Sequence, residues 1–181
     1  MRVSIGLLIA GAAVSAAACN PTSPNSPALL IPSGTHQSPL IALAGQGAGG
    51  VSVTSTPIPE GTMRVDIKVV VAEMRPNSAF IVQRAPDVGR TLTNDGICQR
   101  ALGLSPWSPS DPPAPAFPTF PLNGGVATLT TDGSGAGTLT FEFRSPSITA
   151  GTLFDVMFRL VDNDASPTIE LRSGCFQVAV Q

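Results

Sequence analysis

Charged side chains are scarce in this sequence. Only 12% of its 181 residues are Asp, Glu, Lys or Arg, against about 25% in an average soluble domain. Lys68 is the only lysine, the net charge is −2, and no run of basic residues occurs. A surface that binds nucleic acid needs clustered Lys and Arg to neutralise phosphates. We therefore expect no nucleic-acid partner.

The side chains most used in catalysis are also rare. His36 is the only histidine, and without charged neighbours it is expected to be a solvated linker residue. A Ser-His-Asp hydrolase needs a base beside its nucleophile, so that class is excluded. Two carboxylate pairs, Asp162 with Asp164 and Asp155 with Glu170, are close enough in sequence or hairpin register to meet, but nothing in the sequence indicates the buried acid of a glycosidase. We expect no catalytic residue and no cofactor; a carbohydrate-active enzyme is the remote alternative.

Glycine and proline are what the sequence has in quantity. Each occurs 18 times, alongside 43% hydrophobic residues. Such a composition favours many turns and few long surface helices. Domains centre on roughly 100 to 150 residues, which leaves room for one domain after a targeting segment and a linker. We expect a single all-β domain.

The first 18 residues have the layout of a secretory signal peptide. Arg2 supplies a positive charge, residues 3–14 are apolar and small, and residues 15–18 end in alanine, as at a signal-peptidase site. A transmembrane anchor needs about 20 apolar residues, and this run is shorter. We expect cleavage after Ala18 and export of the mature chain.

The end of this segment, Ala16-Ala17-Ala18-Cys19, resembles the lipobox of bacterial lipoproteins, with Ala16 where leucine is usual. The resemblance implies that Cys19 is acylated and becomes the new N-terminus. The protein would then be held by lipid in the bacterial cell envelope, facing the periplasm or the cell exterior. Ordinary cleavage at the same Ala-x-Ala site is the alternative.

The cysteine count agrees with acylation. In an oxidising compartment three cysteines leave one unpaired. Acylation of Cys19 accounts for the odd cysteine, so Cys98 and Cys175 are expected to form a disulfide.

Residues 20–59 have the composition of a linker. They contain no acidic or basic side chain and are dense in Pro, Ser, Thr and Gly. Apolar runs at residues 28–31 and 40–43 leave open that part of the segment packs on the domain as an edge strand. We therefore expect a signal peptide at residues 1–18, a lipid-anchored tether at 19–59 and the folded domain at 60–181.

Apolar and polar residues alternate through the expected domain. The clearest case is the segment from Met63 to Val71, in which every second residue is apolar, as in a strand with one buried face. Turn residues predict three antiparallel hairpins. They join residues 63–71 to 79–84, 126–131 to 138–144, and 153–161 to 168–180. No segment has a sustained helical period.

Strands of this kind predict an antiparallel β-sandwich of immunoglobulin-like or fibronectin-like architecture. The signature of true immunoglobulin domains is missing. Trp107 lies in a proline-rich segment rather than on a strand between paired cysteines, and the absence of tyrosine excludes a tyrosine corner. The prediction therefore concerns architecture and not membership of a family.

The last predicted strand changes its alternation. Residues around Leu171 and residues around Phe176 need opposite registers, and one extra residue at Ser173-Gly174, a β-bulge, would reconcile them. The bulge would turn Cys175 to the outer face, from which it could reach Cys98.

Proline recurs at every third position from Pro106 to Pro121, which is the period of a polyproline II helix. We expect a long, stiff, proline-rich connection between strands, with Phe117 and Phe120 packed on the domain. The alternative is a recognition strip in which Trp107, Phe117 and Phe120 contact an aromatic-lined groove of a partner.

Two loops carry the oxygen donors that calcium prefers. Asp132 opens a Gly- and Ser-rich turn, and Asp162 and Asp164 flank Asn163. Neither loop completes a recognised site, and both have the residues that turns favour for backbone reasons. We expect no metal site and keep these three aspartates as weak candidates.

These features together predict a non-enzymatic, envelope-anchored binding or structural module. Its expected partners are the membrane, through the N-terminal lipid, and an envelope protein or glycan. A calcium-dependent adhesion module is the alternative.

Overall fold

The computed structural model describes residues 35–85, 98, 117–162 and 169–181, and in these ranges it contains strands and no helix. The all-β prediction is confirmed. Within the same ranges, no helical segment has the length and apolar character needed to cross a membrane. The strands are β1 (Thr35–Ala44), β2 (Ala48–Ser55), β3 (Thr62–Ala72), β4 (Ala79–Arg84), β5 (Pro121–Leu122), β6 (Gly125–Val126), β7 (Thr128–Thr130), β8 (Gly137–Thr149), β9 (Leu153–Val156), β10 (Phe158–Asp162), β11 (Glu170–Ser173) and β12 (Phe176–Ala179).

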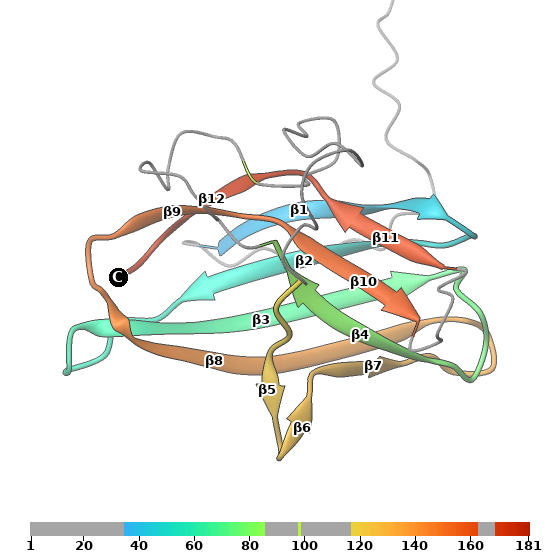
Figure 1. The fold of residues 1–181 in the computed structure, drawn as a ribbon, viewed down its shortest axis with the longest axis horizontal. Helices are drawn as coiled ribbons and strands as arrows, with labels where there is room; N and C mark the ends of the chain where they lie inside the picture. Colours follow the sequence, from blue (N-terminus) through green and yellow to red (C-terminus); the bar gives the residue numbers. More distant parts are fainter. Residues whose placement is uncertain (1–34, 86–97, 99–116, 163–168) are drawn as a thin grey trace, which may run out of the picture.

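Eight of these strands form one antiparallel sheet in the order β7-β4-β10-β11-β1-β2-β3-β8 (Figure 1). The two strands at the ends of this order, β7 and β8, follow each other in the chain and contact each other. The sheet therefore rolls into a barrel-like shape around its core. Two short ribbons, β9 with β12 and β5 with β6, complete the fold.

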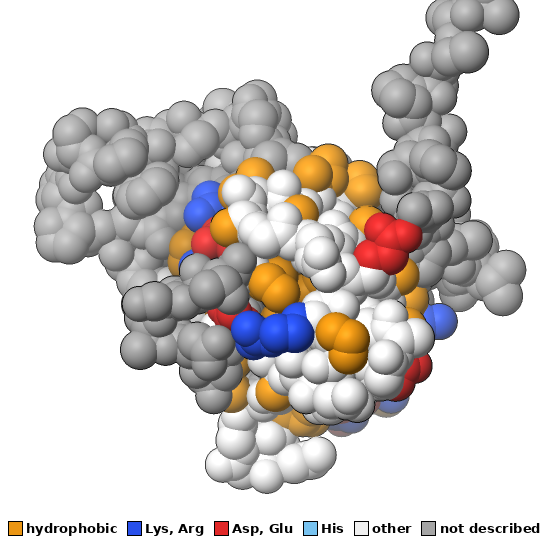
Figure 2. Space-filling view, turned by 90° about the vertical axis from the view of Figure 1, so that its right-hand side faces the viewer, with side chains coloured by type: hydrophobic (Ala, Val, Ile, Leu, Met, Phe, Trp, Pro, Cys, Tyr) orange, Lys and Arg blue, Asp and Glu red, His pale blue; other side chains and the backbone are white. Residues whose placement is uncertain are grey.

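The core of the barrel follows from strict alternation in its strands. On β3, every second side chain from Met63 to Val71 is buried. Full burial of an aliphatic side chain of this size contributes about 2 kcal/mol. Phe120, Phe141 and Phe158 pack among them, with the rings of Phe120 and Phe158 stacked at 5.6 Å between centroids. The outer surface is sparsely charged, as Figure 2 shows for the end of the barrel that carries the β1–β2 and β3–β4 turns.

The predicted tether is wrong over its second half, because β1 and β2 lie inside the eight-stranded sheet between β11 and β3. The segment has the composition of a linker because its residues are small and uncharged. In the structure, small residues allow β2 to pack closely against β3. A Cβ added at Gly49 would lie 2.4 Å from the carbonyl oxygen of Val70 on β3. His36, expected to be a solvated linker residue, is a half-buried member of β1, and its Nε2 accepts a 3.4 Å hydrogen bond from the backbone N–H of Ala179.

Of the three predicted hairpins, only the last is confirmed. Strand β10 pairs with β11, and β9 pairs with β12. The first two are wrong in pairing although their strands exist: β3 pairs with β2 and β8, whereas β4 pairs with β10 and β7. The short turns predicted local pairing, but β3 and β4 pair with strands from elsewhere in the chain, and β7 and β8 contact each other at the two ends of the strand order without pairing.

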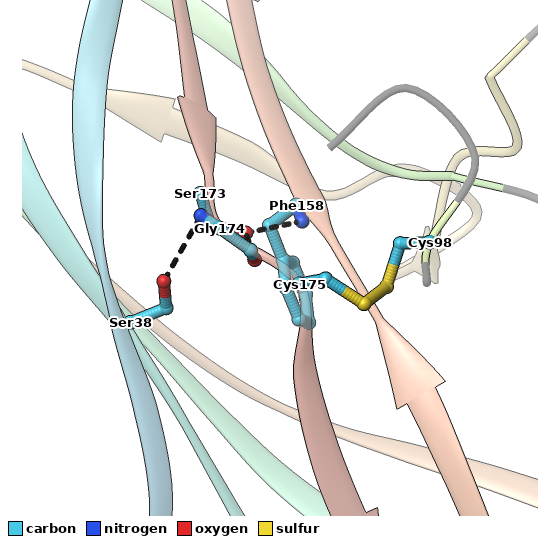
Figure 3. Close-up of a disulfide and its surroundings, with 6 residues drawn as sticks. All are labelled: Ser38, Cys98, Phe158, Ser173, Gly174 and Cys175. Carbon is cyan, nitrogen blue, oxygen red and sulfur yellow. Dashed lines mark hydrogen bonds between the residues drawn. A yellow bond between two sulfur atoms is a disulfide. The ribbon is translucent and has the colours of Figure 1, made fainter. Parts of the chain in front are cut away.

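The change of register near the C-terminus is real, but a strand break produces it instead of a bulge. Strand β11 ends at Ser173 in the eight-stranded sheet, and β12 begins at Phe176 in the ribbon with β9. Figure 3 shows how this crossing is fixed. The backbone N–H of Gly174 donates to Ser38 Oγ at 3.1 Å, and that of Phe158 donates to Ser173 Oγ at 2.8 Å.

Candidate functional site

A cavity of about 340 Å³ opens inside the barrel. Pockets that hold small molecules range from about 300 to 1,000 Å³. Its walls come from β2, β3, β4, β8, β9, β10 and β12, together with Ala85 and Phe120. Most of its lining is apolar and includes Val53, Ile67, Phe120, Phe143, Ile148 and Val178.

The cavity exists because β8 changes the size of its inward side chains. Leu139, Phe141 and Phe143 occupy successive inward positions and pack on the core. Beyond Phe143 the strand continues with Ser145, which is half-buried, and Ser147, which is exposed; both are small and line the cavity. Their hydroxyl oxygens lie 3.0 Å apart. The change from large side chains to serine leaves space at this end and places two hydroxyls on the lining of the cavity.

Arg84 brings a positive charge to this apolar wall. It is the last residue of β4 and shares the inward parity of the buried Phe80 and Val82. Its guanidinium carbon lies 5.8 Å from the ring centroid of Phe120 and 5.6 Å from that of Phe143, within the range of a cation–π contact.

The Arg84 side chain is half-buried, and burial lowers the pKa of its guanidinium, although arginine remains a cation at neutral pH. Its Nε is buried without a hydrogen-bond partner. Among the residues that the structure describes, no carboxylate forms an ion pair with Arg84.

Asp155 is the other ionisable residue in the lining. It is buried and is engaged in an interaction of its own. The carboxylate pair anticipated with Glu170 does not assemble. Asp155 lies opposite Gln177 in the β9–β12 ribbon, whereas Glu170 lies opposite Val161 in the large sheet.

Glu170 belongs to a separate polar cluster on the outside of β10 and β11. Arg159 donates to its Oε2 at 2.8 Å, and Arg172 donates to Oε1. Burial alone would raise the pKa of Glu170, but the hydrogen bonds from the two arginines outweigh it and lower the pKa. The same two guanidinium groups lie 4.6 and 5.3 Å from the centroid of the Phe117 ring.

The Cys98–Cys175 disulfide is confirmed, with 5.3 Å between the two Cα atoms. Cys175 follows the strand break after β11 and is half-buried, with Met157 and Phe117 in the same small cluster (Figure 3). The bridge therefore fastens the connection after β4 to the point where the chain leaves the large sheet.

Of the three aromatic residues considered as partner contacts, the two that the structure describes lie in different clusters. Phe120 is 2% exposed and belongs to the main core, as the packing interpretation expects. Phe117 lies in the separate disulfide cluster under the arginines. Trp107 lies outside the described residues.

The two described aspartates that were considered for calcium are each engaged in interactions of their own. Asp132 Oδ1 accepts hydrogen bonds from the backbone N–H groups of Ser134 and Ala136 at 2.8 and 3.0 Å, which closes its own turn and lowers the pKa of the carboxyl. Asp162 is buried and pairs with Arg75 at 3.4 Å. Asp164 lies outside the described residues, and within those residues no three His, Cys, Asp or Glu side chains form a group that could hold a metal ion.

Sequence reasoning missed Arg84, Ser145 and Ser147. For Arg84 and Ser145 the signal that could have found them is parity, because each continues an apolar alternation into a polar residue on the inward face of its strand, whereas Ser147 is exposed. A charged residue at an inward position marks a place where the core ends or opens.

Comparisons with models of known protein families, with curated proteins and with solved structures find no match for this chain.

Proposed function

We propose that this protein is a non-enzymatic, envelope-anchored binding module that takes an apolar ligand into the cavity of its barrel. One observation supports this proposal above all: a cavity of about 340 Å³ remains open inside an otherwise packed core. Cavities of this size lower stability, and an apolar cavity with a few convergent polar groups is the usual form of a small-molecule site.

A neutral fluorescent probe tests the cavity. The chain should be exported with Cys19→Ser and purified without detergent, because a detergent would compete for the site. N-phenylnaphthylamine should then increase in fluorescence and bind at one site per chain. Ile148→Trp, which places a large side chain in the lining, should abolish binding. Leu153→Trp, at an exposed position on β9, is the matched control and should leave binding intact. An absence of probe binding to the unsubstituted cavity contradicts the proposal.

The anchor is the second part of the proposal, and it rests on the resemblance of residues 16–19 to a lipobox. Labelling with a palmitate analogue in a bacterial host should mark the full chain, and Cys19→Ser should remove the label and release the protein from the membrane fraction. An unlabelled mature protein rules the anchor out.

The finer description of the fold is also proposed. A sheet that rolls until β7 meets β8 encloses its core between two facing layers, as the two sheets of an immunoglobulin-like sandwich do. The proline-rich connection that leads to β5 would then be the long inter-strand loop. Backbone NOEs between β7 and β8 distinguish a closed barrel from a sandwich with two open edges.

A further inference from the structure

Arg84 is placed where a protein rarely leaves a cation without a counter-ion. Its Nε is buried and unbonded, and its guanidinium lies against the rings of Phe120 and Phe143 in the cavity lining. A partly desolvated charge is unfavourable unless it is paired. The cation–π contacts with two rings offset only part of this cost, because they leave the buried Nε–H donor without an acceptor.

Other arginines on the same barrel are paired with carboxylates, which is the usual way to stabilise a partly buried cation. Arg159 and Arg172 share Glu170 on the outer face of the sheet, and Arg64 lies 2.6 Å from Glu142. Arg84 alone among these four is directed to the cavity instead of to a carboxylate. The anion that would complete its hydrogen bonding is therefore expected to come from outside the described fold.

We propose that the cavity binds a single-chain anionic amphiphile, a carboxylate with an unbranched alkyl tail, with the head group on Arg84 and the tail among the apolar side chains. The inference rests on the proposed function and adds the chemical class of the ligand. A guanidinium presents a planar fork of donors that matches the two oxygens of a carboxylate. The hydroxyls of Ser145 and Ser147 lie on the same lining and offer further donors.

The size of the cavity limits the tail. A volume of 340 Å³ corresponds to roughly eleven water molecules at about 30 Å³ each. A single alkyl chain of medium length fits this space, whereas a two-chain phospholipid does not. We therefore expect affinity to rise from hexanoate to decanoate and to stop rising with longer tails.

Head-group selectivity tests the proposal on the unsubstituted cavity. The detergent-free Cys19→Ser chain is titrated by calorimetry with decanoate, decanol and decyltrimethylammonium, which share a tail and differ in charge. Decanoate should bind about tenfold more tightly than decanol, and the cation should bind most weakly. Equal affinity of the three compounds overturns the proposal, even if all of them bind.

Substitution of the arginine gives an independent reading. Arg84→Met keeps a long side chain and removes the charge, so it should cancel the preference for decanoate while decanol still binds. Arg84→Lys should retain part of the preference. Lys68→Met, which removes one positive charge from an exposed position on β3, is the matched control and should behave as the parent does. An unchanged preference in Arg84→Met overturns the role of Arg84.

The two proposals fail in different ways. If neither N-phenylnaphthylamine nor any amphiphile binds, the cavity is not a ligand site and both proposals are wrong. If the neutral compounds bind and decanoate has no advantage, the binding function stands and the assignment to an anion is wrong.

Discussion

The backbone N–H of Gly174 donates a hydrogen bond to Ser38 Oγ across 136 residues of sequence. Ser38 is a buried residue of β1, and Gly174 is the first residue after β11. This single bond joins a segment with the composition of a linker to the point where the chain leaves the large sheet.

Ser38→Ala should therefore lower the free energy of unfolding by about 1 kcal/mol, because it leaves the half-buried Gly174 N–H without its acceptor. Urea denaturation followed by circular dichroism measures the change. Ser147→Ala, at an exposed position on β8, is the control for the same chemical change and should have little effect. Equal stability of the two variants would contradict the structural role of Ser38.

Gly49→Ala should destabilise the protein by about 1 to 3 kcal/mol. The added Cβ would lie 2.4 Å from the carbonyl oxygen of Val70, so β2 and β3 would have to move apart. Gly133→Ala is the matched control, since no atom lies within 4 Å of the position of its added Cβ. If residues 48–55 were a solvated tether, both variants would unfold at the same urea concentration.

Removal of the Cys98–Cys175 bridge in a double serine variant should lower the free energy of unfolding by about 4 kcal/mol, because the bridge closes a long loop in the unfolded chain. Denaturation of the oxidised protein, the reduced protein and the variant measures this effect. The reduced parent should be as stable as the variant. If reduction does not lower the stability of the parent, the bridge does not contribute to the free energy of unfolding.

Glu170→Gln should destabilise the protein at neutral pH and have progressively less effect in acid. The pKa of Glu170 is lowered in the folded state, so its ionised form adds stability above the unfolded pKa of about 4.3. That contribution is lost as the pH falls through the folded pKa. The free energies of unfolding of the parent and of Glu170→Gln should therefore converge as the pH is lowered from 7 to 3. The exposed Glu60→Gln controls for the loss of one negative charge.

Calcium should leave the melting temperature unchanged. Asp132 Oδ1 already accepts hydrogen bonds from two backbone N–H groups, and Asp162 is paired with Arg75. Thermal melts with millimolar calcium and with a chelator give the comparison. A rise in melting temperature with calcium that Asp132→Asn removes would reverse this conclusion and revive the adhesion alternative.

The parts of the fold that could be predicted are those that depend on local alternation. The buried face of β3 and the pairing of β10 with β11 follow from residues close in sequence. The partners of β4 could not be predicted in this way, because β10 lies far along the chain and turn chemistry reports only on neighbouring segments. Strands β1 and β2 could not be predicted from composition, because small, uncharged residues are common both in linkers and in tightly packed sheets.

Less of the candidate site than of the fold could be predicted from the sequence. The inward parity of Arg84 on β4 can be read from Phe80 and Val82. Whether a carboxylate on another strand neutralises an inward arginine depends on register across the barrel, which one sequence does not reveal. Phe120, by contrast, was correctly expected to pack on the domain.

The start of β1 at Thr35 would set how far the barrel could stand from a membrane that held the proposed lipid anchor. If Cys19 carries lipid, the connection to the barrel spans at most about 55 Å when fully extended. A tether ending at residue 59 would have permitted more than twice that reach. Under the proposed anchor, the barrel would stay within about 55 Å of the bilayer surface, where a lipid-derived ligand would have a short path to the cavity.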